Sequence, residues 1–169
     1  MARYVLRVAK DPTTDLRLVP LDGEGRPLRD WLMTFHLASV VVDPYTNESS
    51  WILPTAVRIM RAFTGAAVRV NFIVTAEADD ARTFLGPYAQ EFLVFADPER
   101  QAVKAFGLER LPAFIFLRAD GHVAAAAEGW NSTDWRSVCS AIAKTTAWSK
   151  PDLPTGADPA AFRGSPALV

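Results

Sequence analysis

The chain has 169 residues, half of them hydrophobic, which is enough for one core, and a single domain is expected. Its 18 Lys plus Arg against 19 Asp plus Glu give a formal net charge of −1, and the absence of a long basic run argues against nucleic acid as a partner. One cysteine and two histidines without metal-ligand spacing exclude an internal disulfide and argue against a metal or cofactor.

The first residues lack the apolar core of a secretory signal, and no later stretch is apolar for the roughly 18 residues that a membrane span needs. We therefore expect a cytoplasmic protein that does not insert into membranes.

The N-terminal part predicts a β-hairpin extension over residues 1–27. Residues 4–9 and 15–20 alternate or run apolar on either side of a turn cluster at 11–14, so they are expected to pair. A second turn follows at 21–27, and apolar residues at helical spacing then predict a short helix over 28–35.

The middle of the chain predicts strands and helices in alternation. Residues 38–42 end in three valines, which is typical of a buried central strand. Residues 48–64 form an amphipathic pattern that predicts a helix interrupted by Pro54. Further along we expect a strand at 68–75, an irregular helix at 79–90 broken by Gly86-Pro87, and a strand at 92–96.

The next helix has signals at both ends. Asp97 is a good N-cap and Pro98 suits the first helical position, while Gly107 suits a left-handed C-terminal cap, so the prediction is a helix over 98–106. Residues 113–118 and 123–127 flank an Asp120-Gly121 turn and predict an antiparallel hairpin.

A last helix is expected after the capping residues 131–133, with Trp135, Val138, Cys139, Ile142 and Ala143 forming one apolar stripe. From Ser149 onward the chain is rich in Pro, Ala and Gly without periodicity. The predicted organisation is therefore one domain over 1–148 and a tail or docking segment over 149–169.

The order of these elements resembles the thioredoxin-like superfamily. The most specific stretch is residues 97–121, which is similar to the second half of thioredoxin-like disulfide reductases and peroxiredoxin relatives. The resemblance covers about residues 15–147 and implies an α/β three-layer sandwich with a central mixed sheet. It also implies that the Leu111–Pro112 peptide bond is cis and faces the active site.

The superfamily's redox motif is missing. Its Cys-x-x-Cys pair precedes a helix proline by about five residues, and counting back from Pro54 places Thr46-Asn47-Glu48-Ser49 at the motif. A hydroxyl stays protonated where a cysteine would ionise, so Thr46 and Ser49 cannot exchange disulfides. Cys139 does not replace them, because its place on an apolar stripe predicts a buried side chain.

The resemblance implies a groove whose degenerate active-site positions are Tyr45, Thr46 and Ser49 on one side and Leu111, Pro112 and Ala113 on the other. The simplest interpretation of the two hydroxyls is helix capping; the alternative is that the helix N-terminus holds an anion or a partner's backbone. Asp43, Glu48 and Tyr45 are read as solvated side chains rather than an acid/base set.

Two functional hypotheses remain. The first is a redox-inactive module that binds another protein or peptide through the groove beside the cis proline, where family members pair with substrate backbone. The second is an enzyme of another reaction type that uses the hydroxyls of Thr46 and Ser49. Trp130 and Trp148 are aromatic residues that could lie at an interface.

Overall fold

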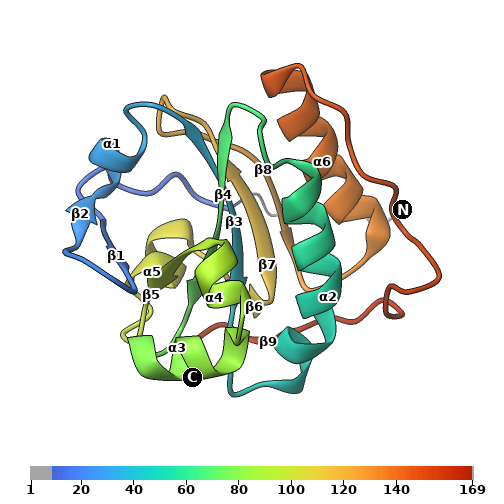
Figure 1. Cartoon of the computed structure of the whole chain (residues 1–169), viewed down its shortest axis with the longest axis horizontal. Helices are drawn as coiled ribbons and strands as arrows, with labels where there is room; N and C mark the ends of the chain where they lie inside the picture. The colour runs from blue at the N-terminus through green and yellow to red at the C-terminus, as the bar shows by residue number, and fades with distance from the viewer. Residues whose placement is uncertain (1–8, 169) are drawn as a thin grey trace, which may run out of the picture.

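A computed structural model describes residues 9–168 and shows a three-layer α/β sandwich (Figure 1). Its central sheet has the strand order β2-β1-β5-β4-β3-β7-β8, and a separate two-stranded sheet joins β6 to β9. The strands are β1 (Arg17–Pro20), β2 (Arg26–Pro27), β3 (His36–Val42), β4 (Val68–Val74), β5 (Leu93–Ala96), β6 (Arg110–Leu111), β7 (Ala113–Leu117), β8 (Val123–Glu128) and β9 (Ser165–Pro166). The helices are α1 (Leu28–Trp31), α2 (Asn47–Ala62), α3 (Ala78–Leu85), α4 (Tyr88–Glu91), α5 (Gln101–Phe106) and α6 (Ser132–Thr146).

Strand β3 lies in the interior of the sheet, parallel to β4 and antiparallel to β7. Because side chains alternate along a strand, Val40 and Val42 join the core under α2 and α6, while Leu37 and Val41 join the core on the opposite face, with residues of α1 and α5. Both faces are covered, which explains why this strand is apolar almost throughout. Figure 1 shows α2 and α6 on one side of the sheet and α1 and α5 on the other.

The N-terminal hairpin differs from the predicted one. Strand β1 pairs with β2 around the second turn, with Arg17 opposite Pro27, and its other edge pairs antiparallel with β5. Residues 4–8 of the expected first strand lie outside the described residues, and Ala9 is not in a strand. The pairing with β5 is a contact over some 75 positions, which local turn signals do not report.

Helix α2 is continuous through Pro54, which corrects the predicted interruption. The proline ring removes one backbone hydrogen bond of the helix. Pro54 and Ser50 are both exposed, so water can take the carbonyl bond that the proline leaves free. The buried face of the helix, which includes Ile52, Ala56 and Ile59, holds both halves against one core.

Helix α5 begins at Gln101 instead of Pro98, so the predicted start is wrong by three residues. Arg100 has a φ of 58° in the left-handed region and cannot continue a right-handed helix. Asp97 still serves the helix, because its Oδ2 accepts hydrogen bonds from the amides of Ala102 and Val103 at 3.0 and 3.4 Å. Gly107 adopts the left-handed C-terminal conformation that the sequence predicted.

The second half of the domain follows the prediction closely. Strands β7 and β8 form the antiparallel hairpin around Asp120-Gly121, and α3 and α4 are separated at Gly86-Pro87. The side chain of Asn131 caps α6 by accepting a hydrogen bond from the Asp134 amide at 2.7 Å. These elements place the β6–β7 junction and the start of α6 beside one another.

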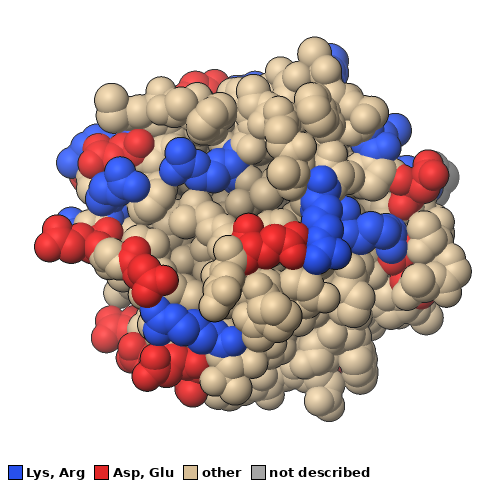
Figure 2. All heavy atoms as spheres, in the orientation of Figure 1, with Lys and Arg blue, Asp and Glu red and all other residues tan. Residues whose placement is uncertain are grey.

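The surface carries small groups of both charge signs. On the face that Figure 2 shows, acidic and basic side chains are interspersed among uncharged ones. Ion pairs such as Arg61–Glu91 at 2.6 Å link separate elements, although pairs this exposed contribute little to stability. Within residues 9–168, every helix is too short or too polar to cross a bilayer.

Candidate functional site

The loop between β3 and α2 is organised by Asp43, the residue that follows the central strand. Its side chain accepts a hydrogen bond from the Tyr45 amide at 3.0 Å through Oδ1 and one from Arg100 Nη2 at 2.9 Å through Oδ2. Asp43 is only 2% exposed. The prediction that it is a solvated side chain is therefore wrong, because the loop folds its carboxylate inward against the mostly buried guanidinium of Arg100.

The hydroxyls of Thr46 and Ser49 bind this loop. The Asp43 amide donates to Ser49 Oγ at 2.9 Å, and Thr46 Oγ1 lies 3.0 Å from the Asp43 carbonyl and 3.2 Å from Ser49 Oγ. Thr46 occupies the N-cap position of α2 without a side-chain capping bond, so the expected capping role is wrong. Ser49 is fully buried, which leaves its hydroxyl without access to a substrate.

The remaining acidic and aromatic candidates of this loop are separated. Tyr45 is 67% exposed and its hydroxyl donates to Asp80. Glu48 instead accepts a hydrogen bond from Ser165 Oγ at 2.7 Å, which lowers the pKa of the Glu48 carboxyl. The structure does not bring Asp43, Glu48 and Tyr45 to one solvent-facing point.

The opposite side of the site is the junction of β6 and β7. The Leu111–Pro112 peptide bond is cis, as the resemblance implies. The side chains of Leu111 and Ala113 are fully buried in the core on the α1 and α5 side of the sheet. Pro112 accepts a hydrogen bond from the Gly129 amide at 2.8 Å, which joins this junction to the start of the α6 connection.

The tail, residues 149–168, packs across the site. In Figure 1 it descends beside α6 and α2 and crosses to β6. There β9 pairs antiparallel with β6, with Ser165 opposite Leu111 and Pro166 opposite Arg110. The Ala167 amide extends the pairing by donating to the Glu109 carbonyl at 2.9 Å. The strand that precedes the cis proline is thus covered by the chain's own C-terminal residues.

A close crossing of two backbones fixes the tail. A Cβ on Gly164 would lie 2.7 Å from the Leu111 carbonyl oxygen, and a Cβ on Gly129 would lie 2.4 Å from the Arg163 carbonyl oxygen. Both glycines also have positive φ, at 89° and 69°. Only glycine fits on either side of this crossing.

Arg100 reaches from the start of α5 to both the loop and the tail. Its Nη2 binds Asp43, as described above, and its Nη1 donates to the Ala167 carbonyl at 2.6 Å. The Arg100 and Asp43 side chains are 15% and 3% exposed, so a mostly buried ion pair presents one donor to the tail. Sequence reasoning missed Arg100, because an arginine in a turn has no local signature of this role.

Aromatic side chains hold the middle of the tail. Phe162 and Trp130 form an antiparallel bridge with two backbone hydrogen bonds of 2.9 Å. The Phe162 ring meets the exposed Trp51 ring edge-on, with centroids 5.6 Å apart. Trp130 Nε1 donates to the Pro159 carbonyl at 2.8 Å, so this tryptophan lies at the interface between domain and tail.

A buried carboxylate, Asp158, anchors the tail to α2. Asp158 accepts hydrogen bonds from Arg58 at 2.6 and 2.9 Å and from Thr55 Oγ1 at 2.7 Å. Burial disfavours its charge, yet the bonds from Arg58, the Thr155 amide and Thr55 outweigh burial and lower the pKa of Asp158 to about 2. The surface that receives the tail, here called the tail-binding surface, is formed by Glu48, Trp51, Arg100, Arg110, Leu111, Gly129 and Trp130.

Cys139 lies in α6 and is fully buried, as predicted. Burial raises the pKa of its thiol from 9.0 to about 12, so the reactive thiolate is suppressed at neutral pH. Within residues 9–168, no three His, Cys, Asp or Glu side chains are grouped as metal ligands.

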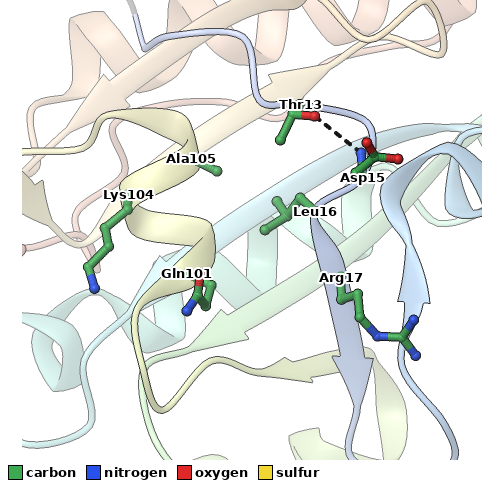
Figure 3. Close-up of a pocket in the computed structure, with 7 residues that line it drawn as sticks. All are labelled: Thr13, Asp15, Leu16, Arg17, Gln101, Lys104 and Ala105. Carbon is green, nitrogen blue, oxygen red and sulfur yellow. Dashed lines mark hydrogen bonds between the residues drawn. The ribbon is translucent and has the colours of Figure 1, made fainter.

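A shallow depression of about 560 Å³ lies elsewhere, between the segment before β1 and helix α5 (Figure 3). Lys104 and Arg17 extend away from its centre in that view, and the Arg17 guanidinium donates to the Gly25 carbonyl. Its polar groups do not converge on one point, so it is a weaker candidate than the tail-binding surface.

These features define a thioredoxin-like α/β protein without a cysteine pair. No protein-family model matches the chain, and no curated protein matches its sequence. Solved structures match its fold. A secreted Mycobacterium tuberculosis disulfide oxidoreductase homologous to E. coli DsbE is 19% identical, with a TM-score of 0.60 over 78% of this chain and 96% of that one.

Two further structures show the breadth of the similarity. A putative thiol:disulfide interchange protein DsbE from Chlorobium tepidum is 19% identical, with a TM-score of 0.62 over 79% of this chain and 97% of that one. The Xanthomonas campestris bacterioferritin comigratory protein is 15% identical, with a TM-score of 0.65 over 82% of this chain and 96% of that one. The chain shares their thioredoxin-like fold, and it has a single cysteine.

Proposed function

We propose that this protein is a redox-inactive binding module that receives an extended polypeptide segment of a partner protein on the tail-binding surface. The observation that carries the proposal is the antiparallel pairing of β9 with β6, directly before cis Pro112. A segment of polypeptide fits there in extended form and with main-chain pairing. This is the geometry of recognition by strand addition.

Such binding does not depend on cysteine chemistry. Main-chain hydrogen bonds supply affinity in strand addition, and side-chain pockets supply specificity. The lone thiol is buried and held in its protonated form, so it offers no route to disulfide exchange. Binding can therefore persist in a protein that has no redox pair.

The alternative of an enzyme using the hydroxyls of Thr46 and Ser49 has less support. Ser49 is fully buried and its Oγ accepts the Asp43 amide. No titratable group stands within hydrogen-bond reach of Thr46 Oγ1 as a base among its described contacts, which are the Asp43 carbonyl and Ser49 Oγ.

A peptide-display selection tests the proposal on the full chain. The Gly164→Val variant should free the surface, because a side chain at position 164 meets the Leu111 carbonyl. The matched control is Gly156→Val, since a Cβ at that tail position contacts nothing within 4 Å. Limited proteolysis of the tail reports whether it is released.

We expect peptides to be enriched on Gly164→Val after counter-selection on Gly156→Val, and to lose binding when Arg100→Ala is added. A Gly164→Val chain that is folded and has a protease-sensitive tail, but enriches no peptide, would refute the proposed function.

A further inference from the structure

We propose that the tail-binding surface selects partner segments with the pattern aromatic-x-Gly-Ser-x-Ala, and that the chain's own residues 162–167 are a resident competitor that such a partner displaces. This inference rests on the proposed function and names the chemistry of its partner. The pattern is taken from which tail side chains the domain contacts and which it leaves in solvent.

The exposure of the side chains in residues 161–168 separates the tail positions that contact the domain from those that face solvent. Four residues of this segment are exposed, namely Ala161, Arg163, Pro166 and Leu168, whereas Ala167 is fully buried. Phe162, Gly164 and Ser165 are partly buried and each contacts the domain. The two variable positions of the pattern are the exposed residues 163 and 166.

The surface accepts only glycine at the position of Gly164, because a side chain there would collide with the backbone of β6. The distance of 2.7 Å from a Cβ on Gly164 to the Leu111 oxygen is shorter than real Cβ contacts, and the atom it meets is backbone that cannot rotate away. The φ of 89° adds a second penalty for any other residue. A competing segment needs glycine at this position to pair with β6.

The serine and alanine positions are selected by polar and steric contacts. Glu48 Oε2 accepts the Ser165 hydroxyl, so a residue without a donor leaves this partly buried carboxylate without that bond. The Ala167 side chain is fully enclosed, which leaves no room for a larger residue. The Ala167 carbonyl meets Arg100 Nη1, which fixes the segment's register against the buried pair with Asp43.

The aromatic position is selected by Trp51. The Phe162 ring stands edge-on to it, and Trp51 is 53% exposed even with the tail in place. Edge-on aromatic pairs contribute beyond their buried area. A partner with a larger aromatic residue here can cover more of Trp51 than the chain's own phenylalanine does.

The resident tail sets a threshold for partners. A tethered segment competes at a high effective concentration, about millimolar for short flexible connections, so weak or partial matches to the pattern do not displace it. The arrangement favours partners that present the whole pattern or that gain contacts outside it.

Fluorescence anisotropy with a labelled synthetic peptide of residues 159–169 tests the inference. Full-length Gly164→Val should bind this peptide at least ten times more tightly than the wild-type chain or Gly156→Val, whose own tails occupy the surface. Ala167→Asp, which places a charge in an enclosed position of the tail, is a second variant that should act like Gly164→Val. Circular dichroism verifies that each receptor is folded.

Peptide variants test the pattern itself. On the Gly164→Val receptor, peptides carrying Phe162→Ala, Gly164→Val or Ser165→Ala should bind at least five times more weakly than the parent. The matched control, Arg163→Ala, changes an exposed residue and should bind as the parent does.

The outcomes separate the inference from the function. If display selects peptides that bind Gly164→Val while the 159–169 peptide does not, or if its Phe162→Ala and Arg163→Ala forms bind equally, the pattern is refuted and the proposed function stands. If no peptide of any sequence binds either released-tail variant, both are refuted. A wild-type dimer that exchanges tails would also overturn the inference, because the tail then serves a second copy of the chain.

Discussion

Asp43 shows how one buried residue organises a site. Its side chain accepts hydrogen bonds from the Tyr45 amide and the Arg100 guanidinium, and its own amide donates to Ser49, so the loop, the start of α5 and α2 meet at a single residue. A sequence pattern places an aspartate after the central strand, but it does not say whether the carboxylate turns inward. The inward orientation depends on Arg100, which lies 57 positions away.

At this scale we predict a large effect of removing the carboxylate. Asp43→Ala should lower the free energy of unfolding by about 3 kcal/mol, because it leaves the mostly buried Arg100 charge without its partner. Urea unfolding followed by tryptophan fluorescence measures the change. Asp15→Ala is the control, because it breaks the exposed pair with Arg29 and should change stability by no more than about 0.5 kcal/mol. Equal effects of the two variants would contradict the buried role of Asp43.

Helix α5 shows how a capping residue can act from outside the expected turn. Asp97 was predicted as the residue next to the helix, yet the helix begins four positions later and the carboxylate still receives two of its amides. The Pro98-Glu99 turn and the left-handed Arg100 bring the side chain back over the helix N-terminus. That detour is what aims Arg100 at Asp43 and at the tail.

At the scale of the element we predict a capping effect. Asp97→Ala should destabilise the protein by about 1 kcal/mol, which is typical for loss of an N-terminal cap, and Asp97→Asn should retain most of the stability because an acceptor remains. Chemical unfolding of both variants gives the values. Glu99→Ala, at an exposed position of the same turn, serves as the control. A neutral Asp97→Ala would show that water caps α5 equally well.

At the scale of the whole molecule, the tail closes the structure by joining α2, β6, α5 and the start of α6. Two of its anchors are carboxylates with lowered pKa values, Glu48 and Asp158. A carboxyl whose folded pKa is below its unfolded value stabilises the folded state above the unfolded pKa and loses that contribution as the pH falls. The tail is therefore held less firmly in acid.

The pH dependence of the Asp158 anchor can be measured directly. The pKa of Asp158 falls from its ordinary value of 3.8 to about 2 in the folded chain. Its stabilising contribution should therefore be fully present above about pH 5 and should be lost progressively between about pH 5 and pH 1. The advantage of the wild-type chain over Asp158→Asn in resistance to urea should therefore be largest at about pH 5 and should shrink steadily as the pH falls toward about 2. A difference that stays constant over this range would contradict the assignment of the anchor.

The sequence by itself determined most elements of the domain and the lack of a redox pair. The alternating faces of β3, the Asp120-Gly121 hairpin and the cap of α6 are signals carried by neighbouring residues, so they can be read along the chain. The absence of a Cys-x-x-Cys pair is a property of composition and needs no structure.

Only the tertiary structure decided how the tail is placed and what the site contains. The pairing of β9 with β6, the Gly129–Gly164 crossing and the bridge from Arg100 to Asp43 and Ala167 join residues 35 to 67 positions apart. The Pro, Ala and Gly residues of the tail have no hydrophobic periodicity from which a partner strand could be predicted. Their pairing is determined instead by the shape and the free hydrogen-bonding groups of the surface on which the tail packs.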